Sequence, residues 1–364
     1  MSANLEVIGL TKKMLSEGVN KNTYWKGKLA PLPKSKALWL LANTRIADDD
    51  YCGVIAQEDG EMVSFIFMFP DLLNVKGEDP RKVYWMISWW VHPKYKDTVL
   101  GTYIYNEAVN LTGKQILIKS YAENVTTFYE KQPFRVIASR LRHTLFFSLD
   151  ASMLIGRFRF LKSVKFLLKP IDSLSYSLLK LINAKCKKRT KALFYDFVTQ
   201  IDDATWDFIK PLCKEDLIYK SKEYINWQLS NVQYTQTPVS SKYPYKSLQT
   251  GISNNIHIHN LKILKSDELI GFISYVINFN ELNVKYFLVG DDANYDICVD
   301  ALMENFIIHK RTFIFTDDTK LSDAINRRYK SIFTHKVTKK GLAHNQTNLE
   351  GADFEMLNRD GHFY

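Results

Sequence analysis

The sequence predicts an α+β fold with two domains, each a mixed twisted sheet flanked by helices, joined by a basic helical linker. The first reason is a repeated order of elements, which occurs once in each half of the 364-residue chain. The second is the net charge of +10, which is concentrated in one segment between the two halves. We therefore predict domains at residues 1–150 and 193–364, with the linker at 151–192.

The first half begins with short elements and continues with three strands. Residues 5–11 suggest a strand. Residues 35–44 suggest a helix, whose four consecutive apolar residues indicate that it is well buried or only partly helical. Apolar runs then predict strands at 52–57, 62–69 and 83–91. The turn Glu58-Asp59-Gly60 separates the first two of these runs, which predicts a β-hairpin.

A helix, a strand, a short helix and further extended chain complete the first half. The apolar residues from Leu100 to Leu111 follow helical spacing, and Gly113 ends that helix. Residues 115–119 read as a strand, 124–131 as a short helix and 135–149 as a strand.

The second half repeats this order from about Leu193. Strands are expected at 256–264, 269–277, 284–289 and 312–316, with helices within 293–309 and 322–329. From Val91 to Gln115 is 24 positions, and from Val289 to Thr312 is 23. This agreement favours an internal repeat of structure, although not of letters. Two unrelated α+β domains are the alternative interpretation.

The linker carries the whole net charge of the protein. From Ala151 to Ala192 there are eleven Lys or Arg residues and one acid, Asp172. Apolar residues from 154 to 168 have helical spacing, Pro170 is expected to end or kink that helix, and a second helix is expected before the Lys185–Lys191 cluster.

Two interpretations of this linker remain open. The simpler is a helical hairpin between the domains, with its charges in water. The functional one is a basic amphipathic surface for an anionic membrane, a polyanionic glycan carrier or RNA. Nucleic acid ranks last, because no RNA-binding motif accompanies the charges.

Other features exclude several classes of protein. The four cysteines are far apart in the sequence, with no Cys-x-x-Cys pair, so neither a disulfide framework nor a zinc site is indicated. The N-terminus lacks the apolar core of a signal peptide, and no apolar run approaches the roughly 20 residues of a membrane span. We expect a cytoplasmic protein, peripheral at the membrane if the basic segment binds lipid.

The start of the predicted helix at 100–111 resembles the acyl-CoA segment of the GNAT acyltransferase superfamily. That segment reads Arg/Gln-x-x-Gly-x-Gly/Ala. Lys96 stands at the Arg/Gln position, Val99 where the first Gly belongs, and Gly101 at the last position. Two such domains in one chain would make a tandem GNAT-type acyltransferase. The resemblance implies acetyl-CoA or another acyl-CoA as co-substrate, bound by a set of residues in this domain: Lys96, Val99, Leu100, Gly101, Thr102 and Asn124.

The physics of this segment agrees with an anion site. A helix N-terminus presents unpaired N–H groups and a partial positive charge, and a pyrophosphate needs close approach to the backbone there. Gly101 permits that approach, and Lys96 adds a charge-assisted contact. The ordinary alternative is a turn that caps a helix.

A second segment, residues 121–134, resembles the family's Asn-x-x-x-x-Tyr-x-x-x-Gly-Phe ending. Asn124, Tyr129 and Phe134 carry the match, and Pro133 stands at the usual Gly. The resemblance places Tyr129 beside the thioester sulfur, as the acid that protonates the departing thiolate. Packing against neighbouring aromatic residues is the equal alternative for Tyr129.

A general base is harder to identify. The strand at 83–91 contains no Asp or Glu; Ser88 lies within it, and His92 follows it at a turn. The acidic run Asp48–Asp50 has two interpretations: it binds a cationic substrate or, more simply, it forms a solvated turn.

In the second half, Asp291 and Asp292 occupy the turn where phosphate would bind, which argues against CoA there. His257 and His259 share one strand face, but no third ligand points to a metal, and we predict none.

We predict an acyltransferase that moves an acyl group from acyl-CoA to an amine or hydroxyl of a small-molecule, glycan or peptide acceptor. A non-catalytic binding or scaffold protein on the same fold is one alternative. The other is an aminoacyl transferase resembling the Fem peptidyltransferases, for which the basic segment would meet tRNA. Affinity for acyl-CoA separates the first interpretation from the other two.

Overall fold

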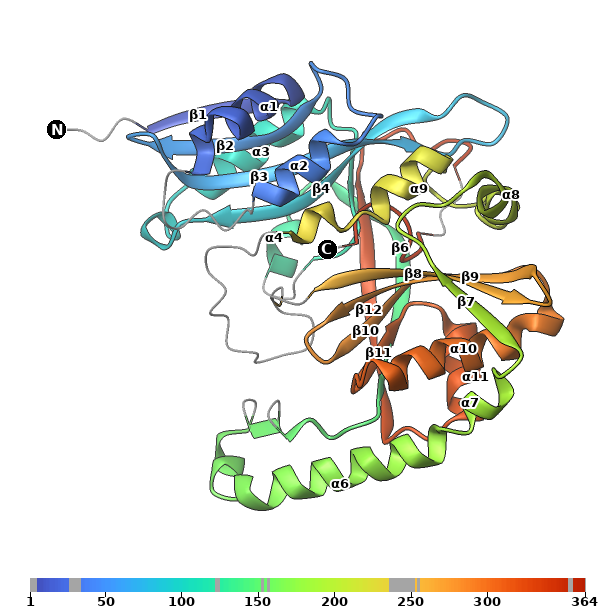
Figure 1. Ribbon diagram of the computed structural model, residues 1–364. Helices are drawn as coiled ribbons and strands as arrows, with labels where there is room; N and C mark the ends of the chain where they lie inside the picture. The colour runs from blue at the N-terminus through green and yellow to red at the C-terminus, as the bar shows by residue number, and fades with distance from the viewer. Residues whose placement is uncertain are drawn as a thin grey trace. The chain divides into compact units, whose positions relative to one another are not determined.

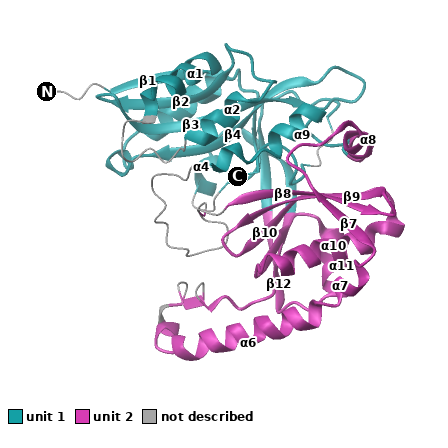
Figure 2. Cartoon of the chain, viewed as in Figure 1, with its two compact units in different colours: residues 1–140, 213–240, 339–364 teal, residues 141–212, 241–338 magenta. Residues whose placement is uncertain are grey.

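The computed structural model describes residues 5–25, 34–121, 125–151, 154–155, 158–235, 253, 256–352 and 356–363. The chain divides into two compact units (Figure 2). Unit 1 comprises residues 1–140, 213–240 and 339–364, and unit 2 comprises residues 141–212 and 241–338. The sequence-based boundaries at 150 and 193 assumed continuous domains, whereas both units are discontinuous.

Unit 1 contains a six-stranded sheet and the helices that cover it (Figure 1). Its elements are β1 (Leu5–Thr11), α1 (Lys12–Lys21), η1 (Thr23–Trp25), α2 (Lys34–Leu41), β2 (Tyr51–Glu58), β3 (Glu61–Leu73), β4 (Arg81–Val91), η2 (Pro93–Tyr95), α3 (Leu100–Leu111), β5 (Ile116–Ile118), α4 (Thr126–Glu130), the beginning of β6 (Phe134–Phe146), α9 (Lys222–Gln228), η5 (Asn231–Tyr234) and the end of β12 (Phe333–His344). The strand order is β1-β2-β3-β4-β5-β12, and only β4 and β5 run parallel.

The hairpin predicted between β2 and β3 is present. Asp59 and Gly60 have φ values of 50° and 82°, as a tight hairpin turn with two left-handed residues requires. The helix predicted at 35–44 is α2, which buries Ala37, Trp39 and Leu40. Helix α1 and helix α9 were not predicted. Both faces of the sheet carry apolar clusters, with α3 and α4 on one face.

Unit 2 repeats the sheet and contains the basic segment. Its elements are part of β6 (Phe134–Phe146), η4 (Arg159–Lys162), α6 (Lys165–Asn183), α7 (Cys186–Arg189), β7 (Leu193–Phe197), α8 (Asp203–Leu212), β8 (His257–Lys265), β9 (Glu268–Asn278), β10 (Glu281–Val289), η6 (Asp292–Asn294), α10 (Tyr295–Ile308), β11 (Phe313–Thr316) and α11 (Thr319–Arg328). The strand order is β6-β11-β10-β9-β8-β7.

The internal repeat is confirmed in the strand pairing. In unit 1 the parallel pair includes Tyr84 with Ile116, and in unit 2 it includes Leu282 with Ile314. Both members of the second pair lie 198 positions after their counterparts. The fold class predicted from the sequence, two mixed sheets flanked by helices, is therefore correct.

The last strand of each repeat lies in the sheet of the other. β6 ends the first repeat, yet its residues 143–146 pair with β11 of unit 2. β12 ends the second repeat, yet its residues 342 and 343 pair with β5 of unit 1. This exchange and the inclusion of residues 213–240 in unit 1 make the units discontinuous, and sequence spacing alone gives no sign of either.

The basic segment also differs from its prediction. Pro170 does not end a helix and does not divide the segment into two helices, because α6 continues through it from Lys165 to Asn183. The segment is part of unit 2 rather than a separate linker. None of the described helices is long and apolar enough to cross a membrane.

Candidate functional site

The candidate site in unit 1 begins where β4 and β5 separate. These parallel strands pair only at Tyr84 with Ile116 and at Trp85 with Leu117. β4 then continues to Val91 while β5 ends at Ile118. The antiparallel register between β3 and β4 shifts at Ile87, which is the extra residue of a β-bulge. The β5-facing edge of β4 beyond Trp85 thus has no strand partner among the described residues.

The side chain of Trp85 is fixed at this branch point. Its indole Nε1 donates to Asp71 Oδ2 at 2.9 Å. On its other side, a Cβ atom added to Gly361 would lie 2.8 Å from the ring, so only glycine fits there, at a φ of 66°. Asp71 also accepts from Arg45 Nη1 and Tyr224 Oη, both at 2.6 Å. We therefore regard Asp71 as the residue that orients Trp85.

Helix α3 begins beside the open edge of β4 and brings together most of the predicted binding residues. Leu100 is buried, and its N–H is already bound to Thr98 Oγ1 at 3.3 Å. The N–H groups of Gly101 and Thr102 have no partner among the described residues. The Lys96 side chain is exposed in the preceding turn. The two N–H groups and Lys96 leave this end of the helix open to an anion, although the same turn also carries the exposed carboxylate of Asp97.

Val99 and Gly101 act differently from what the motif suggested. Val99 has ordinary helical dihedrals, and its side chain is 81% exposed, so it leaves the turn unstrained. A Cβ atom on Gly101 would lie 3.0 Å from Val91 Cγ2 and 3.5 Å from the Trp89 ring. Gly101 therefore permits close packing of α3 on β4.

An aromatic cluster fills the α3 side of the branch. Trp89 stacks with Tyr105 of α3 at 5.7 Å between ring centroids and lies 5.0 Å from Phe128. The Trp89 Nε1 and Tyr105 hydroxyl are both buried and have no hydrogen-bond partner among the described residues. Sequence analysis missed both residues, because nothing in the pattern distinguishes Trp89 from Trp90.

Tyr129 belongs to the same cluster, and its role stays a prediction. Its ring contacts Tyr105, Tyr121 and Phe134, with centroids 5.1–6.4 Å apart. Burial raises the pKa of Tyr129 to about 12, so its hydroxyl keeps its proton at neutral pH. Such a group donates a hydrogen bond well but releases its proton poorly. Asn124, the remaining predicted binding residue, lies outside the described residues.

The candidate bases near β4 are already engaged. His92 Nδ1 accepts from the Lys94 backbone at 3.1 Å, which puts the proton of the neutral ring on Nε2. Glu58 binds Lys94 and the Tyr95 hydroxyl, and these hydrogen bonds lower its pKa. Ser88 is the residue directly after the bulge, and its hydroxyl is the polar side-chain group closest to the bulge in sequence.

Comparison with solved structures identifies the fold of the chain. A GCN5-related N-acetyltransferase from Anabaena variabilis matches with a TM-score of 0.51 at 7% identity, covering 96% of this chain and 75% of that one. Saccharomyces cerevisiae N-myristoyltransferase, solved with bound myristoyl-CoA, matches with a TM-score of 0.51 at 12% identity, covering 94% and 79%. The chain has a GNAT-type fold. No family model matches the sequence, and no curated protein does.

Within this GNAT-type fold, the corresponding turn of unit 2 is acidic. Asp291 Oδ1 accepts from the Asn294 N–H at 2.9 Å and caps η6. Asp292 pairs with Lys320 of α11 at 2.7 Å, and that hydrogen bond lowers its pKa. The sequence showed no nearby cation, whereas the fold supplies Lys320. That unit 2 binds no CoA stays a prediction.

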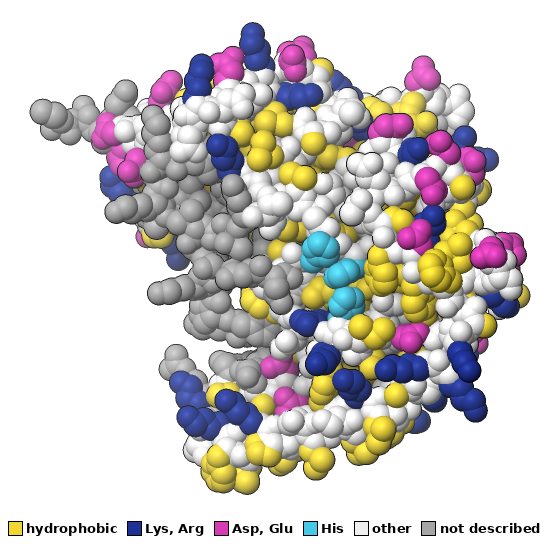
Figure 3. Space-filling model, in the orientation of Figure 1, with side chains coloured by type: hydrophobic (Ala, Val, Ile, Leu, Met, Phe, Trp, Pro, Cys, Tyr) yellow, Lys and Arg dark blue, Asp and Glu magenta, His cyan; other side chains and the backbone are white. Residues whose placement is uncertain are grey.

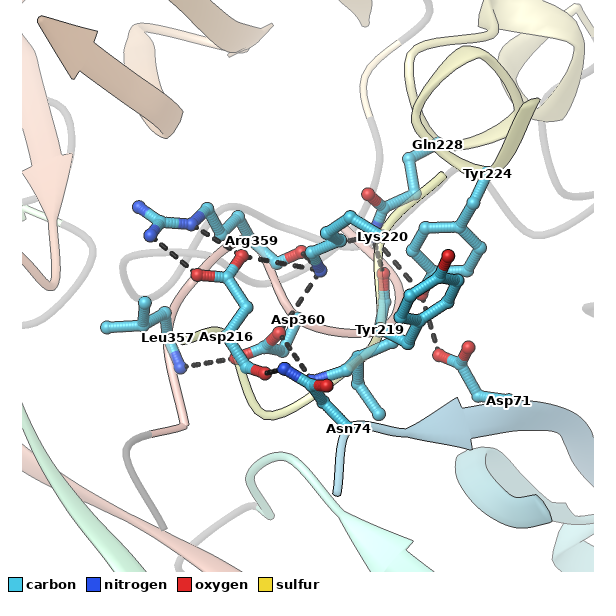
Figure 4. Close-up of polar contacts among 12 residues, drawn as sticks. Asp71, Asn74, Asp216, Tyr219, Lys220, Tyr224, Gln228, Leu357, Arg359 and Asp360 are labelled. Carbon is cyan, nitrogen blue, oxygen red and sulfur yellow. Dashed lines mark hydrogen bonds and ion pairs between the residues drawn. The ribbon is translucent and has the colours of Figure 1, made fainter. Parts of the chain in front are cut away.

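A second polar cluster in unit 1 is structural (Figure 4). Asp216 accepts from Arg359 Nη2 at 2.6 Å and lies 3.8 Å from Lys220 Nζ. Lys220 also donates to Asp360 Oδ1 at 3.1 Å. These buried charges balance one another and join residues 216–220 to the C-terminal segment.

Two further sequence-based hypotheses concern histidines and acids. Asp50, from the acidic run, is buried and accepts from Lys82 Nζ at 2.8 Å and the Ala47 N–H at 2.8 Å, so it holds a turn rather than facing solvent. His257 and His259 do lie together, with ring centroids 4.8 Å apart. Among the described residues, no group of three or more ligands suits a metal ion.

Proposed function

We propose that the protein is an acyltransferase that binds acyl-CoA, such as acetyl-CoA, in unit 1. The observation that carries this proposal is the open edge of β4 beyond Trp85, next to the unpartnered N–H groups of Gly101 and Thr102. The pantetheine amides of CoA can extend the β4 edge by backbone hydrogen bonds, as an added strand does. Its pyrophosphate would then lie at the start of α3, near Lys96.

Transfer would occur by direct attack of an acceptor amine or hydroxyl on the thioester carbonyl. Backbone N–H groups on the open edge of β4 would stabilise the oxyanion. The Tyr129 hydroxyl, which keeps its proton, would donate a hydrogen bond to the departing thiolate. Because His92 and Glu58 are engaged elsewhere, we infer that an amine acceptor reacts after losing its proton to water. The rate at low acceptor concentration should therefore rise with pH up to the pKa of the acceptor amine.

Two matched pairs of variants test the binding site by calorimetry with CoA and acetyl-CoA. Lys96→Glu should weaken binding at least tenfold, whereas Lys13→Glu, at another exposed lysine of unit 1, should not. Trp89→Phe removes the unpartnered Nε1 and should weaken binding about fivefold, whereas Trp90→Phe, on the other face of β4, should not. Equal effects within each pair, or no heat with any acyl-CoA, would exclude this site.

The full chain is needed for this test, because residues 1–150 lack α9 and the β12 strand of unit 1. A non-catalytic binding protein is the second candidate, and the absence of a carboxylate from β4 favours it. Acyl-CoA binding without thiol release in the presence of any tested amine would support that candidate.

A further inference from the structure

Helix α6 of unit 2 presents an apolar stripe to solvent. Its exposed apolar side chains are 44–74% exposed and occur along most of its length: Phe166, Leu167, Ile171, Leu174, Leu178, Leu181 and Ile182. At 3.6 residues per turn, all of them except Phe166 form a stripe about 100° wide. A surface helix normally turns such a stripe toward its own core, so α6 has the opposite orientation.

Polar contacts on the other side of α6 fix that orientation. Asp172 Oδ1 accepts from Ser148 Oγ at 2.6 Å, and its Oδ2 accepts from the Ala151 N–H at 2.9 Å. Near the helix end, Asn183 exchanges two hydrogen bonds with the Lys330 backbone, at 2.7 and 2.9 Å. The apolar stripe therefore cannot rotate inward without breaking these partly buried hydrogen bonds.

Basic side chains lie near both ends of the stripe. Lys162 precedes the helix, Lys165 and Lys169 lie in its first two turns, and Lys185, Lys187 and Lys188 follow it; all six are exposed. The single acid of residues 151–192 is Asp172, and unit 2 occupies both of its oxygens. Figure 3 shows hydrophobic side chains along the lower rim, where α6 lies, with Lys and Arg side chains beside them.

We propose that α6 docks unit 2 on an anionic membrane surface and lies parallel to it. The stripe would enter the boundary between headgroups and acyl chains, about 5–10 Å deep, while the lysines contact lipid phosphates. The helix lies on the membrane rather than crossing it, since none of the described helices suits a span. This proposal goes beyond acyl transfer and does not depend on it.

Charge distinguishes an anionic membrane from two other possible partners of the stripe, a second copy of the chain and RNA. A second copy of the chain would bring the same lysines against these, with no acidic residue on the exposed face of α6 to offset them. RNA would neutralise the lysines but would leave the Leu and Ile side chains in water. An anionic bilayer satisfies both the charge and the apolar stripe.

Cosedimentation of the full chain with vesicles tests the proposal. Binding should be strong with phosphatidylcholine mixed with phosphatidylglycerol, weak with phosphatidylcholine alone, and reduced by high salt. Replacing Lys162, Lys165, Lys187 and Lys188 by Glu should abolish binding, because each lost positive charge lowers partitioning roughly fivefold. A control with the same net charge replaces four exposed lysines elsewhere, Lys13, Lys131, Lys214 and Lys265, by Glu and should retain most binding.

The apolar contribution has its own pair of variants. Leu174→Ser with Leu181→Ser should lower partitioning at least tenfold without changing thermal stability, because these side chains are 72% and 74% exposed. Phe194→Ser, at a side chain 67% exposed on β7, should leave binding unchanged. A polarity-sensitive dye on Leu178→Cys should shift to the blue on binding, and the four natural cysteines are buried, which favours selective labelling.

Four outcomes would overturn the proposal. Equal binding to neutral and anionic vesicles would show that anionic lipid is not required. Loss of binding in the control lysine variant would show that α6 is not the docking surface. A dimer in solution that Leu174→Ser with Leu181→Ser dissociates would assign the stripe to a second copy. Retention on RNA with no vesicle binding would assign the lysines to nucleic acid.

Discussion

Replacing Asp71 by Ala should destabilise unit 1 more than any surface change, because Asp71 carries four hydrogen bonds in a buried place. It accepts from Arg45, Trp85, Tyr224 and the Leu72 N–H, and the Arg45 side chain is only 7% exposed. Removing one partner of a buried ion pair leaves an uncompensated charge and costs about 3–5 kcal/mol. Tyr224→Phe removes one hydrogen bond to a charged group, so its cost should be about 1.5–3 kcal/mol.

Urea unfolding followed by tryptophan fluorescence is the assay, since six of the seven tryptophans belong to unit 1 and only Trp206 to unit 2. The midpoint should fall most for Asp71→Ala, less for Tyr224→Phe and hardly at all for Asp49→Ala, an exposed acid of the same unit. If Asp71→Ala and Asp49→Ala gave the same midpoint, the network would not hold Trp85. Its proposed link to the β4–β5 branch would then be wrong.

Three other changes have expected outcomes. Gly101→Val should lower the melting temperature as well as CoA affinity, because its Cβ would meet Val91 Cγ2 at 3.0 Å and overpacking costs about 1–3 kcal/mol; lost affinity with unchanged melting would instead place the phosphates at Gly101. Tyr129→Phe should lower kcat more than it raises KM, measured by thiol release, and unchanged kcat would make Tyr129 a packing residue. Burial, with the neighbouring His309 and His257, lowers the pKa of His259 to about 3. Between pH ~3 and ~6.5, His259 therefore binds a proton in the unfolded chain but stays neutral in folded unit 2. The stability of unit 2 should therefore fall as pH drops from ~6.5 toward 3, seen as lower amide-exchange protection factors in β8 and β9, and His259→Phe should flatten that dependence.

The sequence predicts most of the fold because the local signals are strong. Apolar runs bounded by turns located β2, β3 and β4 within a few residues, and the repeat of spacing anticipated the two related sheets. The exchange of β6 and β12 was missed, because strand partners more than a hundred residues apart leave no mark on periodicity. Pro170 does not end the helix, as one of its two predicted effects required, because the rest of the helix, held by Asp172 and Asn183, tolerates one lost backbone hydrogen bond.

The candidate site was predicted less completely. Helical spacing and one glycine were enough to locate the start of α3. The bulge at Ile87 shifts the alternation of β4, so Trp85 and Trp90 share one face and Trp89 faces α3. Without that shift, simple alternation would have placed Trp85 and Trp89 together. Asp71 was missed because its partners, Arg45 and Tyr224, are distant in sequence.

The exchanged last strands constrain how the protein is made. During synthesis, the free edge of β5 must wait for β12, which leaves the ribosome roughly 220 residues later. A nascent chain in which α3 and β5 have already formed would still expose the unpaired edge of β5, and an unpaired strand edge promotes aggregation. We therefore expect unit 1 to complete its folding only after β12 has left the ribosome, and we expect chains that stop before residue 339 to depend on chaperones or to be degraded.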